Sequence, residues 1–187
     1  MKKFFFLTGI FLIAASITTA QHPQFGLKAG VNISKIDIDD GNDLDSKAGF
    51  YLGGLAHIHM TRHFALQPEL MFSAQGGESG SITAKRNYIN MPVLLQYMTN
   101  TGFRLQTGPQ LGFLVSAKNE SGNVSANVKD QLNTADIAWA FGASYITRSG
   151  FGVDARYNLG FTNMNESETP KAHNRVWQLG AFYQFRH

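Results

Sequence analysis

The feature of this sequence that most constrains its fold is a strict alternation of apolar residues with polar or small ones. The alternation is clearest between Phe151 and Phe161, where every second residue is apolar. Because successive side chains of a β-strand point to opposite faces, a two-residue period predicts a strand with two different faces. One face of this strand is wholly apolar, and the other carries Asp154 and Arg156 among glycine and asparagine. The fold therefore depends on which face meets water.

The same period recurs along the chain and predicts eight strands. Their approximate ranges are 25–34, 50–60, 64–73, 89–97, 103–115, 139–145, 151–161 and 177–186. Polar connections join them, long ones at 35–47, 74–86, 116–136 and 162–175 and short ones at 61–63, 99–102 and 147–150. Antiparallel neighbours whose connections alternate long and short form an up-and-down meander. We therefore expect an all-β, eight-stranded antiparallel barrel.

Three prolines, Pro68, Pro92 and Pro109, fall inside the predicted strands. Proline removes a hydrogen bond from the strand ladder and is expected at edges or bulges. In a closed barrel we expect these prolines to mark bulges.

The first twenty residues have the form of a secretory signal peptide. Lys2 and Lys3 precede an apolar run, 4–17, and small residues lead to Ala20, where we expect cleavage. The alternative is a retained anchor, but the run is shorter than the roughly 20 residues of a helical span. The mature chain, 21–187, is then a single domain.

Cleavage of the leader changes the charge balance. The 16 Lys and Arg residues fall by two to 14, against 13 Asp and Glu, so the formal net charge drops from +3 to +1. The mature chain lacks the clustered basic character of a nucleic-acid-binding protein, and we expect no nucleic-acid partner. Because the chain has no cysteine, disulfides, thiol chemistry and a lipid-modified N-terminal cysteine are excluded.

Two properties of the alternating rows predict that the apolar faces point outward. The apolar rows are too bulky for an eight-stranded barrel, whose interior is only just wide enough for side chains to fill. The polar rows are rich in Gly, Gln, Asn and Ser rather than the Lys and Glu of a solvated surface. With the rows inverted, lipid meets no charged residue, and an Arg or Lys there would cost about 2–4 kcal/mol at the bilayer midplane. The alternative is a secreted soluble barrel that binds an apolar ligand.

Three segments carry a resemblance to a known family: 66–72 (LQPELMF), 88–95 (YINMPVLL) and 154–160 (DARYNLG). The chain resembles the small outer-membrane β-barrel proteins of the PorT-like group, which are similar in design to OmpA and OmpX barrels. The resemblance covers the whole mature chain and implies an outer-membrane location with both termini in the periplasm. It also implies contact with outer-membrane lipid and lipopolysaccharide. The last strand would resemble the signal read by the outer-membrane insertion machinery, although Arg186 and His187 follow Phe185 here.

Five charged residues fall on the rows that would face the lumen. They are Lys28, Glu69, Arg104, Asp154 and Arg156. Because buried charges must be paired, we expect a luminal ion-pair network centred on Arg156. Glu69 would reach it across the lumen, and Asp154 shares its strand. The favoured interpretation is a structural plug, and the alternative is a proton or ion path.

Two further clusters are candidates for metal binding. His57 and His59 share one face of a strand, with His63 close by in the turn, but luminal polar packing is the favoured interpretation. Asp37, Asp39 and Asp43 lie in an acidic segment, 37–45, with the alternating acids of a calcium loop. That segment lacks the glutamate at the twelfth position, so a solvated loop is favoured. We expect no metal and no cofactor.

A lumen this narrow and this filled excludes a general porin. The expected function is non-enzymatic and lies in envelope integrity or in surface binding and adhesion, with a possible extracellular ligand at the long loops. The alternative is a lipid A-modifying enzyme that uses His and Ser. No serine is placed beside a histidine and an acid in a recognisable arrangement, which argues against catalysis.

Overall fold

The computed structural model describes residues 23–38, 45–80, 82–121, 124–129, 132–162 and 172–185. These ranges contain nine strands: β1 (Gln24–Ile38), β2 (Asp45–His59), β3 (Phe64–Ser79), β4 (Ile82–Met98), β5 (Phe103–Ser121), β6 (Val124–Asn127), β7 (Ala135–Ile146), β8 (Phe151–Gly160) and β9 (Ala172–Gln184). Within the same ranges, no helix is long and apolar enough to cross a membrane. The predicted signal peptide lies outside the described residues.

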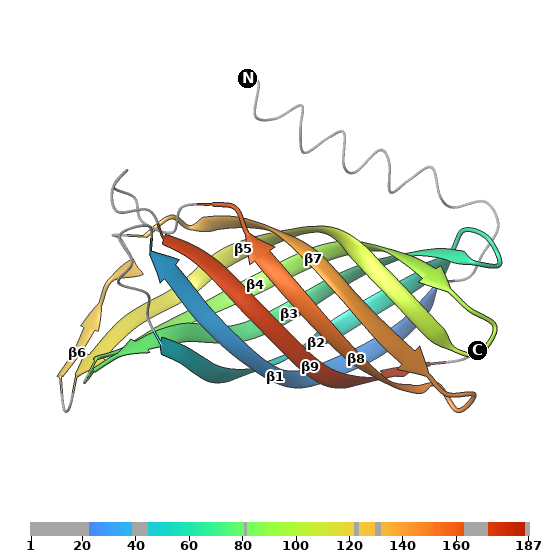
Figure 1. Ribbon diagram of the computed structural model, residues 1–187, viewed down its shortest axis with the longest axis horizontal. Helices are drawn as coiled ribbons and strands as arrows, with labels where there is room; N and C mark the ends of the chain where they lie inside the picture. The colour runs from blue at the N-terminus through green and yellow to red at the C-terminus, as the bar shows by residue number, and fades with distance from the viewer. Residues whose placement is uncertain are drawn as a thin grey trace, which may run out of the picture.

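Eight of the described strands close into an antiparallel barrel (Figure 1). Each pairs with its neighbour in the chain, except that β5 pairs with β7, and β1 completes the ring by pairing with β9. β4 stands at one end of the linear strand order and is also paired with β5, so that the eight strands form a closed ring, while β6 lies beyond β5 at the other end of that order. The predicted up-and-down barrel of eight strands is therefore confirmed.

The two faces of the strands are inverted relative to a soluble protein. Leu27, Leu105 and Val153 point outward and are 61%, 50% and 51% exposed, whereas Arg156 points inward and is 1% exposed. An outer wall of this composition is covered by lipid, and the lumen is filled by polar side chains. A soluble barrel with an apolar interior is excluded by this arrangement.

The strands extend into all four of the predicted long loops, and two of these extensions form a projecting part of the barrel. β3 continues to Ser79 and β4 begins at Ile82, so the predicted loop 74–86 is a hairpin that turns at Gly80, where φ is +56°. The next strand continues to Ser121, and the short β6 follows within the predicted loop 116–136. We call residues 74–80, 82–87, 116–121 and 124–127 the arm, which extends beyond the other strands at one end of the barrel (Figure 1). Gly and Ser disfavour strands, but pairing with neighbouring strands overrides that propensity.

The prediction of bulges at Pro68, Pro92 and Pro109 is wrong for the strands that the structure describes. The pairing register is the same on both sides of each proline. Register shifts occur instead within 46–51 of β2 and at 87–88 of β4. A proline lacks only its own N–H group, so it removes one rung of the ladder without requiring an extra residue.

Candidate functional site: a polar lumen closed at one end

The centre of the lumen holds a charged pair that joins opposite walls of the barrel. Arg156 on β8 donates from Nη1 to Oε2 of Glu69 and from Nη2 to Oε1 of the same side chain, each at 2.8 Å. Glu69 lies on β3, which is not a neighbour of β8 in the sheet. The pair is bidentate, the geometry that fixes a guanidinium against a carboxylate most firmly.

A second cation completes this group. Lys28 Nζ lies 2.7 Å from Oδ2 of Asp154 and 3.7 Å from Oε1 of Glu69, so it bridges the two carboxylates. All four charged side chains are buried, and they carry two positive and two negative charges. The structure therefore brings together four of the five predicted residues. It differs from the prediction in that Asp154 is held by Lys28, whereas Arg156 contacts Glu69.

Tyr51 also belongs to this group, and the sequence analysis did not single it out. Its hydroxyl donates to Oδ1 of Asp154 at 3.4 Å, and its ring is buried. A Cβ atom at Gly180 would lie 2.1 Å from that hydroxyl oxygen, and one at Gly30 would lie 2.7 Å from it. The absence of side chains at these two positions makes room for the tyrosine. Strand alternation could have predicted that Tyr51 faces the lumen, because it lies between outward-facing Phe50 and Leu52.

Arg104 and the two candidate histidines lie closer to the short turns. Arg104 donates from Nη1 to Gln184 Oε1 at 3.2 Å. His57 is buried, with Nδ1 3.3 Å from Oε1 of Gln67, and its ring meets that of His59 edge to face at 4.6 Å. Among the described residues, no three His, Cys, Asp or Glu side chains are grouped so that they could hold a metal ion.

The acidic segment is described only in part. Asp37 forms ion pairs with Lys35, at 3.3 Å, and with Arg175 on β9. Asp39 and Asp43 lie outside the described residues. Asp37 is thus neutralised by cations of the same barrel wall.

The arm end of the lumen is closed by an apolar cluster. Ile36, Tyr88, Leu114 and Ala117 are buried there, and Val128 and Leu132 from the segment after β6 pack against them. The backbone N–H of Val128 donates to the carbonyl oxygen of Ala117 at 3.1 Å, which fixes the segment over the lumen. This cluster was not predicted, because most of that segment was expected to be a polar loop. Tyr88 and Leu114 could have predicted it, because they are large residues on rows that are otherwise polar.

The surface of the arm carries paired charges and one exposed strand. Lys47 pairs with Glu78 at 3.2 Å, and Lys85 pairs with Glu120 at 2.6 Å. The hydrogen bond from Lys85 holds the pKa of the Glu120 carboxyl below its usual range. All four residues of β6 are exposed, and in the described part of the chain this strand pairs with β5 alone.

Comparisons with known proteins agree with this architecture. The model of a protein family described as outer membrane protein beta-barrel domain matches residues 19–166. No curated protein matches the sequence.

Two solved structures show the same fold at low sequence identity. Neisserial surface protein A (NspA) is 16% identical, with a TM-score of 0.63, and 86% of this chain covers 97% of that chain. Ail, the attachment invasion locus protein of Yersinia pestis, is 20% identical, with a TM-score of 0.57, and 88% of this chain covers all of that chain (100%). A further structure of Ail contains the heparin analogue sucrose octasulfate, and there the TM-score is 0.55 at 20% identity.

Proposed function

This chain belongs to the family of outer-membrane β-barrel domain proteins whose model it matches, and on that premise we propose that it is a non-enzymatic surface-binding protein. The chain is an outer-membrane protein, and its apolar wall lies in the lipid of that membrane. The barrel serves as the anchor, and the arm makes contact with an extracellular partner.

The orientation of the barrel follows from its connections. Barrels of this class have short turns in the periplasm and longer loops outside the cell. The three short turns of this chain, at 60–63, 99–102 and 147–150, lie at one end, and the arm lies at the other. The arm therefore projects from the cell surface.

The observation that carries the proposal is the exposed edge of the arm. β6 continues the sheet of the barrel wall beyond the membrane and leaves one edge open among the described strands. An open edge presents unpaired N–H and C=O groups, and an extended polypeptide can add to it as a further strand. We infer that the partner is a polypeptide segment in extended conformation.

The charges of the arm do not favour a polyanionic partner. Lys47 and Lys85 are each neutralised by a glutamate, and Lys85 and Lys118 face each other across two strands with Glu120 beside them. Heparin, an analogue of which is bound by Ail, is therefore the contrasting probe.

Other features support an anchor rather than a channel or an enzyme. The cross-lumen pair Arg156–Glu69 and the apolar cluster at the arm end both obstruct the lumen. We also infer that the chain is assembled by the outer-membrane insertion machinery and falls within the PorT-like group, which the three resembling segments support. A role in envelope integrity is the second candidate, favoured by the ion-paired lumen.

The test compares cells that display the full chain with cells that display a variant lacking the tip of the arm. Replacing residues 119–126 with Asn-Gly closes the hairpin with a two-residue turn, because Lys118 and Asn127 are paired. We expect the full chain to bind surfaces coated with unfolded casein, and the variant to lose that binding. Neither should bind immobilised heparin.

Equal binding of casein by the two chains would overturn the surface-binding function. Increased killing by sodium dodecyl sulfate, in cells whose casein binding is unaffected by the deletion, would instead assign the chain to envelope integrity. Cleavage or modification of lipopolysaccharide by the purified protein, lost on changing His57 and His59, would replace both with an enzymatic function.

A further inference from the structure

The open edge of β6 presents the backbone groups of two particular residues. The backbone N–H of Val128, which follows the strand, donates to the carbonyl oxygen of Ala117 on β5, in register with the pairing of the two strands. In an antiparallel pair, the backbone groups of successive residues point alternately toward the neighbouring strand and away from it. Those of Ser125 and Asn127 therefore point away from β5, to the edge where no described strand pairs with them.

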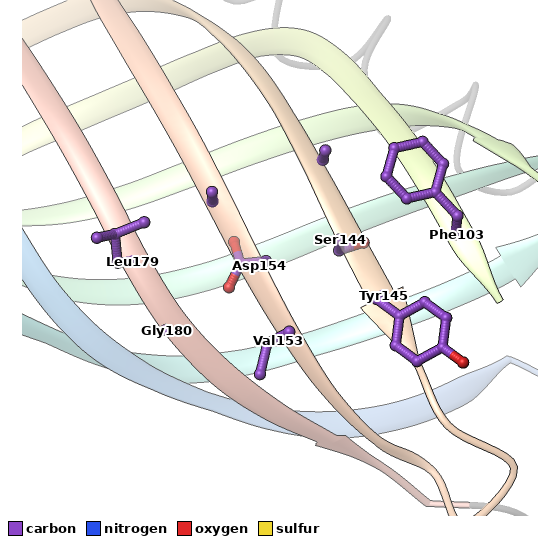
Figure 2. A pocket seen from close by; sticks show the side chains of 9 residues that line it. Phe103, Ser144, Tyr145, Val153, Asp154, Leu179 and Gly180 are labelled. Carbon is purple, nitrogen blue, oxygen red and sulfur yellow. The ribbon is translucent and has the colours of Figure 1, made fainter.

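One face of β6 is apolar. Val124 and Ala126 share this face with Val128, which packs against the apolar cluster at the arm end of the lumen. Val124 is 71% exposed, although the arm lies outside the lipid. Most other large apolar side chains that are exposed lie on the lipid-facing wall, as Figure 2 shows for Val153 and Leu179. Val124 thus offers apolar surface to a partner in water.

The other face of β6 is polar. Ser125 and Asn127 lie on it, and they are paired with Glu120 and Lys118 of β5. The two residues whose backbone groups point to the open edge are therefore the same two whose side chains are polar. Hydrogen bonding at the edge and polarity of the face are thus linked in this strand.

An antiparallel strand added at this edge would alternate in the same way. Its residues opposite Ser125 and Asn127 would exchange hydrogen bonds with them and place their side chains on the polar face. Its other residues would direct their N–H and C=O groups away from β6 and lie opposite Val124 and Ala126. Pairs of this second kind bring side chains closer together, so apolar side chains there gain the most contact.

From this linkage we propose that the edge of β6 selects extended segments in which polar and apolar residues alternate, with the polar residues hydrogen-bonded to β6. The inference rests on the proposed surface-binding function and names the class of polypeptide that the arm binds. A segment with the opposite phase would place polar side chains against Val124 and apolar ones beside Glu120 and Lys118. Such a segment binds more weakly.

The test uses two isomeric biotinylated peptides in which valine and threonine alternate, with lysine at both ends for solubility. One carries N-methyl groups on every valine and the other on every threonine, so each has a single edge that can donate hydrogen bonds. Both residues are β-branched, which matches the strand propensity of the two peptides. Cells that display the full chain should bind the peptide methylated on valine about five-fold more tightly, the effect of one strong cross-strand pair.

Three variants locate this preference on β6. Exchanging two neighbouring side chains, Val124→Ser together with Ser125→Val, should bring the ratio of the two affinities to one or below. Val124→Ile should keep the ratio. The variant in which Asn-Gly replaces residues 119–126 should bind neither peptide. Heat-modifiable gel migration shows whether each variant is folded.

Equal binding of the two isomers by cells whose arm still binds casein would overturn the selection and leave the surface-binding function standing. A preference for the peptide methylated on threonine, or a ratio that the exchange of residues 124 and 125 does not change, would also overturn the selection. If the full chain binds neither casein nor either peptide, the surface-binding function and this inference fall together.

Discussion

At the scale of single residues, the charged group at the centre of the barrel can be stable only if its geometry offsets the cost of removing its charges from water. Removing two opposite charges from water costs several kcal/mol per ion, and their attraction offsets this only when the geometry is good. Arg156 and Glu69 meet that condition through two hydrogen bonds of 2.8 Å. Removing one partner would leave the other buried without its main counter-charge.

We therefore expect Arg156→Leu to lower the free energy of unfolding by about 3–5 kcal/mol, since Glu69 would keep only Lys28 at 3.7 Å and Gln67. The measurement is urea unfolding in lipid vesicles, followed by heat-modifiable gel migration. The double variant Arg156→Leu with Glu69→Leu should recover most of the loss, because both charges are then absent. An unchanged unfolding midpoint in the single variant would show that this pair does not stabilise the folded barrel.

The composition of this group could be predicted from the sequence, but its pairing could not. Strand alternation assigns Lys28, Glu69, Asp154 and Arg156 to the lumen, and the requirement for charge balance then brings them together. Which cation meets which carboxylate depends on the height of each residue along the barrel axis. Because the strands are tilted, that height is set by the register between strands. Alternation alone does not contain the register, so it did not predict that Lys28 holds Asp154.

At the scale of elements, the sequence located every barrel strand but misjudged where several of them end. The largest errors fall in the Gly- and Ser-rich stretches at 74–86 and 116–121, which lack an apolar row because they extend beyond the lipid. Local propensity is weak there, and the structure depends on pairing between β3, β4 and β5. The effect of the three prolines could not be predicted for the same reason: whether a strand keeps its register after losing one hydrogen bond depends on its pairing with neighbouring strands.

The apolar cluster at the arm end holds the segment after β6, and we expect its loss to expose that segment. Leu114→Ala removes a buried side chain, a change that costs about 2–5 kcal/mol in well-packed sites. Trypsin should then cleave after Lys129 faster on intact cells, since cleavage follows the population of the open form.

The matched control is Leu111→Ala on the same strand, whose side chain faces lipid. That variant should be cleaved after Lys129 at the rate of the unmodified chain. If Leu114→Ala is cleaved no faster than Leu111→Ala, the cluster does not secure the segment.

At the scale of the whole molecule, the outward placement of the apolar rows accounts for the membrane location, the polar lumen and the exposed arm. The outward rows are apolar through the middle of the barrel, and charged outward residues such as Lys85, Lys118 and Arg175 occur at the arm end. This distribution sets the height of the membrane on the barrel wall. It leaves the arm in water and the central ion pairs in a lipid-enclosed lumen.

A cation introduced into the middle of the lipid-facing wall tests this arrangement directly. Leu70 lies outward near the centre of β3 and is 58% exposed, so in water its replacement by arginine would cost little. In a bilayer the same change should cost about 2–4 kcal/mol. We expect Leu70→Arg to lower the urea midpoint in vesicles, whereas Leu70→Phe should not. Lys85→Arg, a cation already at the outer boundary, should be neutral, and an equal effect of Leu70→Arg and Lys85→Arg would place the membrane elsewhere on the barrel.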